Sequence, residues 1–239
     1  MKQQKYIIGI DDAGRGPVIG PMVLSGIVIK DNKTEDKKLK KLDVKDSKLL
    51  QKNKREQIAE HLVKNYNYEI NLVSPDEIDS RTFAGTNLNK IEAVKSAQII
   101  NNLIKKTLKD LKQDNNVNNI KFKAIIDCPS PNITAWANYL KTYIEKPGLV
   151  KLQCEHKADM NHKIVSAASI IAKQTREIEI EKIKKEFNID FGSGYCHDPL
   201  TSDFLKGDIK HLQEKGIIRK SWYTYTRVIA EKEQKKLEF

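Results

Sequence analysis

The stretch GIDDAGRGPVIGP at residues 9–21 decides the fold, together with the apolar run at residues 6–10 that leads into it. A short apolar run that ends in charged residues is typical of a buried strand. This strand would present two adjacent carboxylates, those of Asp11 and Asp12. The glycines behind it would form a turn with accessible backbone N–H groups, made by Gly14, Arg15 and Gly16.

Three interpretations of this stretch are open. The carboxylates could hold a hard divalent cation such as Mg²⁺, while the glycines let the backbone approach a phosphate or a sugar. The glycines could instead form a dinucleotide-binding turn, but the spacing is GxGxxxG, and two prolines and a strand follow rather than a helix. The stretch could also be an acidic surface turn.

Farther along the chain, strand and helix patterns alternate. Helical spacing of apolar residues predicts helices at residues 51–65, 87–111 and 162–187 and from residue 223, and loops at residues 31–41 and 112–121. Short apolar or alternating runs predict strands at residues 22–29, 68–73, 122–127 and 150–153. The pattern therefore predicts the α/β class, with a main domain at residues 1–190 and a helical cap at residues 191–239.

Two further motifs carry carboxylates. The segment AIIDCPSPN places Asp127 at the end of an apolar strand, and KADMNHKIVSAASIIAK places Asp159 just before a long helix. Either aspartate could simply cap a helix, as could Asn161. Beside a first strand that ends in Asp11, however, Asp127 suggests two strands that present carboxylates to one cleft, as in two-metal phosphoryl-transfer sites.

Other segments suit contacts with nucleic acid. In FGSGYCHDP, two glycines precede Tyr195, which could stack on a base or sugar or lie half-buried in a loop. The segments KDSK and RKSW combine cations with hydroxyls, as phosphate contacts require, although each alone is ordinary surface. The two segments span residues 45–48 and 219–222.

Composition narrows the class of protein. The chain has 239 residues, with 43 Lys and Arg against 32 Asp and Glu, and thus a net charge of +11. No apolar run approaches the roughly 18–20 residues of a membrane span, and three widely spaced cysteines argue for a reducing, cytoplasmic location. The positive charge favours a polyanionic partner.

Taken in order, these motifs resemble those of ribonuclease HII, in its archaeal and eukaryotic branch, over about residues 6–229. The resemblance implies a ribonuclease H-like mixed β-sheet flanked by helices, with a small helical C-terminal domain. It also implies an endonuclease, dependent on Mg²⁺ or Mn²⁺ with two ions in the active complex. Such an enzyme cuts the RNA strand of RNA/DNA hybrids and single ribonucleotides in duplex DNA, leaving 5′-phosphate and 3′-OH ends. The competing class is a basic nucleic-acid-binding protein without catalytic activity.

The resemblance also implies residue roles. The family's four catalytic, metal-binding carboxylates fall on Asp11, Asp12, Asp127 and Asp159. Its substrate-binding residues fall on Gly14, Arg15, Gly16, Ser47, Lys48 and Tyr195, with a weaker match at Lys157 and Arg219. One departure matters: the second carboxylate of the family is usually Glu, and here it is Asp12.

The C-terminal segment EQKKLEF has two interpretations. Gln234, Leu237 and Phe239 are spaced like the start of a sliding-clamp-binding peptide, but the chain given stops before a second aromatic residue. The segment could otherwise be a frayed helix end. No feature of the sequence predicts subunit association, and we expect a monomer.

Overall fold

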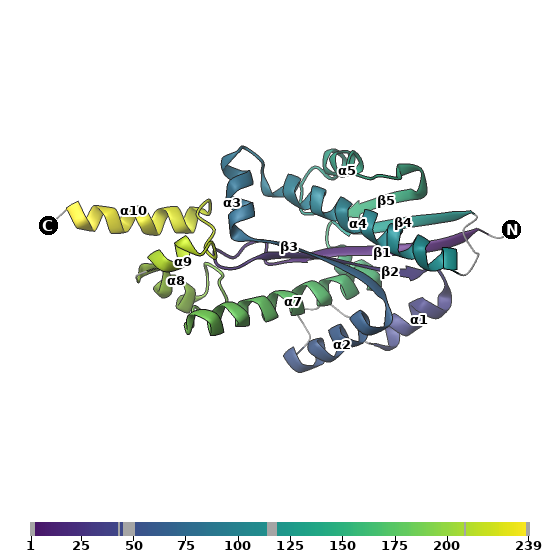
Figure 1. Cartoon of the computed structure of the whole chain (residues 1–239), viewed down its shortest axis with the longest axis horizontal. Helices are drawn as coiled ribbons and strands as arrows, with labels where there is room; N and C mark the ends of the chain where they lie inside the picture. The colour runs from purple at the N-terminus through teal and green to yellow at the C-terminus, as the bar shows by residue number, and fades with distance from the viewer. Residues whose placement is uncertain (1–2, 43, 45–50, 114–118, 208, 238–239) are drawn as a thin grey trace. The chain divides into compact units, whose positions relative to one another are not determined.

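The computed structural model describes residues 3–42, 44, 51–113, 119–207 and 209–237. By the packing of its backbone the chain forms two compact units (Figure 1). Unit 1 comprises Met1–Ala13, Leu24–Asn71 and Asn89–Gln174, and unit 2 comprises Gly14–Val23, Leu72–Leu88 and Thr175–Phe239. Of the domains predicted at residues 1–190 and 191–239, the second lies wholly in unit 2, which also takes in earlier segments of the chain. The two-domain division stays a prediction.

A five-stranded mixed sheet forms the framework, with strand order β3-β2-β1-β4-β5. Every strand predicted from the apolar pattern is present, so the α/β assignment is confirmed. The strands are β1 (Gln4–Ala13), β2 (Met22–Lys30), β3 (Asn67–Val73), β4 (Ile120–Asp127) and β5 (Val150–Glu155).

The register of three parallel strands brings two carboxylates to the same edge. Strand β1 pairs in parallel with β4, with Ile10 opposite Ile126, so Asp11 and Asp127 follow at the same level. Strand β5 extends the parallel part, with Glu155 opposite Asp127. Strand β1 runs on to Ala13, however, so it does not end at the aspartates as predicted, and Asp11 and Asp12 lie within the strand.

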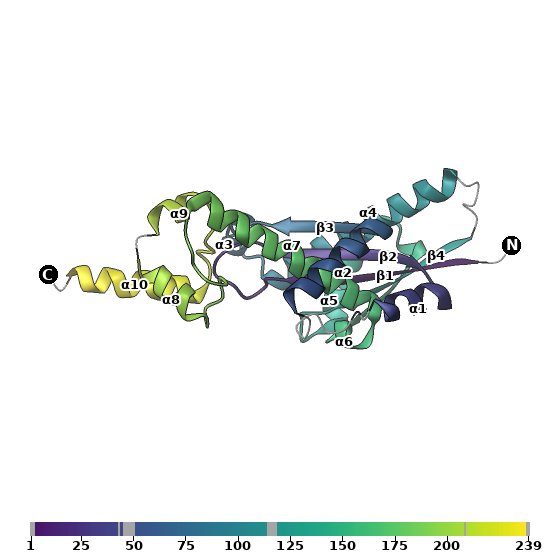
Figure 2. The ribbon, with the colours of Figure 1, turned by 90° about the horizontal axis from the view of Figure 1, so that it is seen from below.

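Helices cover both faces of the sheet in unit 1. Figures 1 and 2 show α4 (Leu88–Gln113) and α5 (Ile133–Lys141) on one face, and α1 (Lys33–Lys41), α2 (Lys52–Asn65) and the start of α7 (Lys163–Phe187) on the other. Helix α7 packs so closely on β1 that a Cβ at Gly9 would lie 2.4 Å from the carbonyl oxygen of Ile164. Only glycine fits this crossing.

The predicted loop at residues 31–41 is wrong, because α1 occupies it. The Asn32 side chain caps the helix by accepting the Glu35 N–H at 2.9 Å, and Leu39 is buried against the core. One apolar residue in a lysine-rich stretch gives too weak a period to predict a helix. Of the predicted loop at residues 112–121, the structure describes only the ends, in α4 and β4.

Unit 2 has its own apolar core. It gathers Val18 and Ile19 with residues of the second half of α7 and of the helices that follow. Residue Ile19 forms a β-bridge with Ile218. Among the described residues, the α-helices of unit 2 besides α7 are α3 (Pro75–Phe83), α8 (Pro199–Lys206), α9 (Lys210–Glu214) and α10 (Tyr223–Leu237), and unit 1 also contains the short helix α6 (Ala158–Asn161).

No helix in the described part of the chain combines the length and the apolar character that a bilayer crossing demands. The three cysteines, Cys128, Cys154 and Cys196, are free thiols.

Candidate active site

The carboxylate of Asp11 is the most buried of the four predicted ones, with 6% of the residue exposed. Burial, followed by the neighbouring charges of Asp12 and Asp127, raises its pKa well above the usual value, against a hydrogen bond from Ser169 that lowers it. The backbone N–H of Asp12 donates to Asp11 Oδ1 at 2.8 Å. The Asp11 side chain is therefore held in place, and its ionised form is electrostatically unfavourable there.

Asp127 ends β4 and accepts the backbone N–H of Ala158 at 2.9 Å. Burial raises the pKa of the Asp127 carboxyl, and the charge of Asp159 raises it further. The alternative that Asp127 caps the next helix is wrong: Asn132 caps α5 by accepting the N–H of Ala135 at 3.0 Å. Asp127 instead holds the start of α6, which is far along the sequence.

Asp159 lies inside α6, and α7 begins only at Lys163. Asp159 is therefore not the N-cap of the long helix. The Ser166 hydroxyl of α7 donates to the Asp159 carbonyl oxygen, which ties the two helices together. The aspartate is thus carried on a short helix that Asp127 anchors at one end and α7 at the other.

The four carboxylates are neighbours within unit 1. The charges of Asp12 and Asp127 act on Asp11, and the charge of Asp159 acts on Asp127. Among the described residues, no group of three or more His, Cys, Asp or Glu side chains is already arranged to hold a metal ion. The carboxylates nevertheless fit a divalent cation, because hard cations take oxygen ligands and positive charge would offset the repulsion that raises the pKa of Asp11.

The predicted glycine-rich turn lies in unit 2. Gly14 has a φ of +80°, and a Cβ there would lie 2.4 Å from Cδ of Arg176. The turn is held by Arg219, whose guanidinium donates to the carbonyl oxygens of Gly14, Arg15 and Gly20 at 2.6 to 3.1 Å. Arg219 is 0% exposed, so the interpretation of this side chain as a surface phosphate contact is wrong.

Tyr195 lies beside the same turn. A Cβ at Gly16 would be 3.7 Å from the Tyr195 ring, which is van der Waals contact. Trp222 Nε1 donates to the Gly16 carbonyl oxygen at 3.0 Å. The Arg176 guanidinium lies 5.1 Å from the centre of the Tyr195 ring. Unit 2 thus brings together the turn and the tyrosine that the sequence placed about 180 residues apart.

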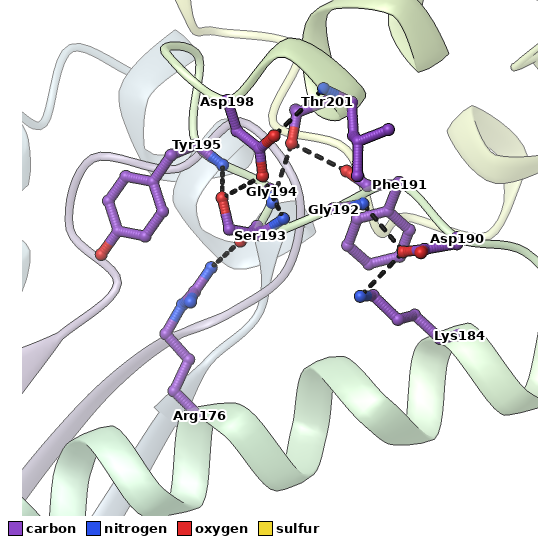
Figure 3. A network of polar contacts seen from close by, with 11 residues as sticks. Arg176, Lys184, Asp190, Phe191, Gly192, Ser193, Gly194, Tyr195, Asp198 and Thr201 are labelled. Atoms are coloured by element: carbon purple, nitrogen blue, oxygen red, sulfur yellow. Dashed lines mark hydrogen bonds and ion pairs between the residues drawn. The ribbon is translucent and has the colours of Figure 1, made fainter. Parts of the chain in front are cut away.

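A polar network fixes the loop before Tyr195 (Figure 3). The buried Thr201 hydroxyl donates to the Phe191 carbonyl oxygen at 2.7 Å and accepts the Gly194 N–H at 3.0 Å. Asp198 accepts the N–H and hydroxyl of Ser193, both at 2.7 Å, and these bonds lower the pKa of Asp198. The sequence signal for Asp198 is the Asp-Pro pair that starts α8, where Asp198 is the N-cap.

Asp79 of α3 is another residue that the sequence analysis missed, after Thr201 and Asp198. Its buried carboxylate accepts the N–H groups of Lys220 and Ser221 at 2.7 and 3.0 Å, and the Ser221 hydroxyl at 2.6 Å. It therefore fixes the segment on which Arg219 and Trp222 lie. No local pattern links α3 to this distant segment.

Of the three remaining predicted substrate-binding residues, only Lys157 is described, and its backbone is hydrogen-bonded to the carboxyl of Asp127. Ser47 and Lys48 lie outside the described residues. Lys157 is exposed at the start of α6, in a left-handed conformation with a φ of 57°. The roles of these three residues stay predictions.

Comparison with known proteins identifies the family of the chain. The family model described as Ribonuclease HII matches residues 8–225. A ribonuclease HII from Methanococcus aeolicus is 39% identical over 236 residues, covering 97% of this chain and 84% of the relative. The ribonuclease H2 structure from Pyrococcus horikoshii OT3 is 34% identical, with a TM-score of 0.76, and 93% of this chain and 96% of that one are covered. The structure of a PCNA:RNase HII complex from Archaeoglobus fulgidus is 36% identical, with a TM-score of 0.75 and the same coverage. With a family model that matches most of its length and relatives near 40% identity, the chain belongs to the ribonuclease HII family.

Proposed function

We propose that this endoribonuclease hydrolyses the RNA strand of RNA/DNA hybrids and cuts at single ribonucleotides in duplex DNA, leaving 5′-phosphate and 3′-OH ends. The observation that supports this most directly is the environment of Asp11, a buried carboxylate beside Asp12 and Asp127. Such a group of like charges costs folding stability, and enzymes keep such groups where chemistry uses them.

Asp11, Asp12, Asp127 and Asp159 are the residues that would hold the divalent cations on which the ribonuclease HII family depends. When bound, two Mg²⁺ or Mn²⁺ ions supply Lewis acidity that activates a water and stabilises the leaving 3′-oxygen. The chain's part is to hold the carboxylates rigidly: strand β1 fixes Asp11, and the Ala158 N–H fixes Asp127.

Discrimination of RNA from DNA falls to the turn in unit 2. The ribose 2′-OH is both a donor and an acceptor, so backbone groups of Gly14, Arg15 and Gly16 can read it. Arg219 and Trp222 hold the carbonyl groups of this turn in fixed directions. Tyr195, stacked on Arg176, offers a ring face on which a sugar can pack.

The function is tested by cleavage of a duplex with one central ribonucleotide beside a long RNA/DNA hybrid, in Mg²⁺, in Mn²⁺ and with chelator. We expect both substrates to be cut, and cutting to stop with chelator. Running Asp12→Glu in parallel tests the departure from the family pattern. A carboxylate about 1 Å short can cost on the order of 10²-fold, so we expect Asp12→Glu to raise the rate in Mg²⁺ by about tenfold.

Asp36→Glu is the matched control, because Asp36 is an exposed carboxylate of α1 that pairs with Lys40 at 2.7 Å. Its rate should equal that of the unmodified chain. A duplex that is bound but uncut with every cation would contradict the proposed function and favour a nucleic-acid-binding protein. An unchanged rate in Asp12→Glu would show that the shorter side chain already reaches its position.

We also propose that the C-terminal segment binds a sliding clamp, as the PCNA complex of the Archaeoglobus fulgidus relative suggests. The segment offers Gln234, which is exposed on α10, with Leu237 and Phe239. We expect immobilised clamp to retain the full chain but not a chain that lacks residues 233–239. Cleavage of a short duplex, assayed without clamp, should be equal for the two chains. Equal retention of both chains would exclude this segment as the contact.

A further inference from the structure

Four lysines of unit 1 lie together on one face of the sheet, at the end away from the carboxylates. Lys5 of β1 is in register with Lys121 of β4, and Lys123 of β4 is in register with Lys151 of β5. Residues two apart on a strand share a face, and so do residues in register on neighbouring strands. We call these four residues the lysine patch.

The lysine patch concentrates charge that the sheet does not neutralise. Like charges directly across a strand pair are destabilising. None of the four lysines has a carboxylate within ion-pair distance in the described part of the chain. Lys121 Nζ instead donates to the Gly148 carbonyl oxygen at 2.8 Å. The four lysines lie in register despite the repulsion between them, and a bound anion would reduce that repulsion.

The surface at the lysine patch is hollowed. A hollow of about 440 Å³ is lined by the four lysines and by residues of β1, β4 and β5, with Asp31 as its one acidic residue. An adjoining hollow adds Lys109 and Lys146 and shares Lys121. The two hollows share Lys121, so the basic residues extend from the three strands to Lys109 of α4 and to Lys146. This is more charge than a single phosphate requires.

Tyr6 and Phe122 also line the hollow at the lysine patch, but at 6% and 2% exposure they offer no ring for reading a base or anchoring a protein. The two aromatic residues of these strands, Tyr6 and Phe122, alternate with the lysines and are buried on the other face, where their rings stack at 5.5 Å. Protein interfaces depend on buried aromatic or apolar anchors, and single-strand binding depends on stacking. Lysines alone match a duplex backbone, whose phosphates carry one charge per roughly 1.7 Å of helix axis.

We propose that the lysine patch is a second, sequence-independent binding surface for the phosphate backbone of duplex nucleic acid, separate from the cutting site. The inference rests on the proposed function, which makes a duplex the substrate. From Lys5 to Asp11 is six residues of strand, or about 20 Å. The patch would therefore contact phosphates well away from the cut, and it would contribute affinity but not discrimination.

The test is the salt dependence of binding to an all-DNA duplex of about 30 base pairs, which extends roughly 100 Å at 3.4 Å per pair. We compare the full chain with the double variant Lys121→Gln/Lys151→Gln. Removing one lysine that neutralises a phosphate should make the negative slope of log K against log salt shallower by about 0.9. We therefore expect the slope to be shallower by about 1.8 for the double variant. A duplex of about 10 base pairs, roughly 34 Å long, should show a smaller change.

The matched control is Lys37→Gln/Lys185→Gln, which removes the same charge from two exposed lysines outside the patch. Equal slopes for the two double variants would overturn the proposal, because net charge alone would then account for binding. Urea unfolding checks that both variants are folded. Cleavage of a ribonucleotide-containing duplex by the unmodified chain is measured separately. A chain that fails to cut but shows the slope difference contradicts the proposed function and leaves the patch supported.

Discussion

Asp11→Asn is expected to lower cleavage of a ribonucleotide-containing duplex by about 10³-fold or more, while binding of the uncut duplex is retained. Charge stabilisation by metal ions supplies several kcal/mol to such reactions, and a difference of about 1.36 kcal/mol is tenfold in rate. Asparagine keeps the size and the Oδ1 acceptor that receives the Asp12 N–H, so the backbone of β1 is preserved. The substitution removes the negative charge at the most buried carboxylate of the group.

The same substitution should make the metal-free protein more stable at neutral pH. Because the folded-state pKa of Asp11 is raised, the folded protein binds the proton more tightly than the unfolded chain. Stability therefore falls as the pH rises from the unfolded value of 3.8 through the raised folded pKa, and it stays lower above that pKa. Asparagine cannot ionise, so this part of the pH dependence should disappear.

Melting temperatures from pH 4 to 8 with chelator, together with single-turnover cleavage with metal, measure both effects. Asp36→Asn is the control, because its exposed carboxylate should change neither result. Cleavage by Asp11→Asn at saturating metal would remove Asp11 from the catalytic group. A melting temperature of Asp11→Asn below that of the unmodified chain at pH 7 would show that the ionised Asp11 carboxylate does not destabilise the folded protein.

Arg219→Met should destabilise the protein by about 3–5 kcal/mol, because several buried carbonyl groups would be left without donors at about 1–3 kcal/mol each. The methionine side chain fits a similar volume but has no N–H group. The carbonyl oxygens of Gly14, Arg15 and Gly20 all accept from the guanidinium that this substitution removes. Urea unfolding measures the difference in free energy.

Measuring KM shows whether Arg219 also positions the glycine-rich turn, in addition to stabilising the fold. At urea-free, low-temperature conditions where Arg219→Met remains folded, we expect a higher KM for a single-ribonucleotide duplex, because the turn that reads the 2′-OH no longer has its support. Arg219→Lys should recover part of both effects. Arg227→Met is the control, since Arg227 is exposed and lies 3.6 Å from Glu231 in an i,i+4 pair. Equal stabilities for the two methionine variants would contradict the assigned role of Arg219.

The strands could be predicted because short apolar or alternating runs that end at polar residues are typical of buried and half-buried strands. Helix α1 could not, because capping by Asn32 and local ion pairs, rather than an apolar stripe, define it. The placement of Asp127 at a strand end is confirmed, whereas its hydrogen bond to Ala158 joins segments 31 residues apart. No spacing in the sequence carries that information.

The residues around the glycine-rich turn show the same limit. The motif RKSW identified Arg219, but a cation in a polar segment suggests surface, and its burial depends on carbonyl groups about 200 residues earlier. Asp79 was missed for a related reason, because it accepts from an N–H group 141 residues away. Thr201 and Asp198 bond to backbone groups 10 and 5 residues earlier, in a loop that has no regular period. Sequence patterns report which groups are present more reliably than which groups they satisfy.

The bond between Asp127 and Ala158 also bears on how genetic variation at this site will be interpreted. Ala158 directly precedes Asp159, so a substitution at Asp127 also affects the segment that carries Asp159. Asp127→Ala removes the acceptor as well as the charge, whereas Asp127→Asn removes only the charge. In a mutational scan, Asp127→Ala should therefore lower activity more than Asp127→Asn does. The difference in activity between the two variants measures the effect of losing the hydrogen bond that positions Asp159.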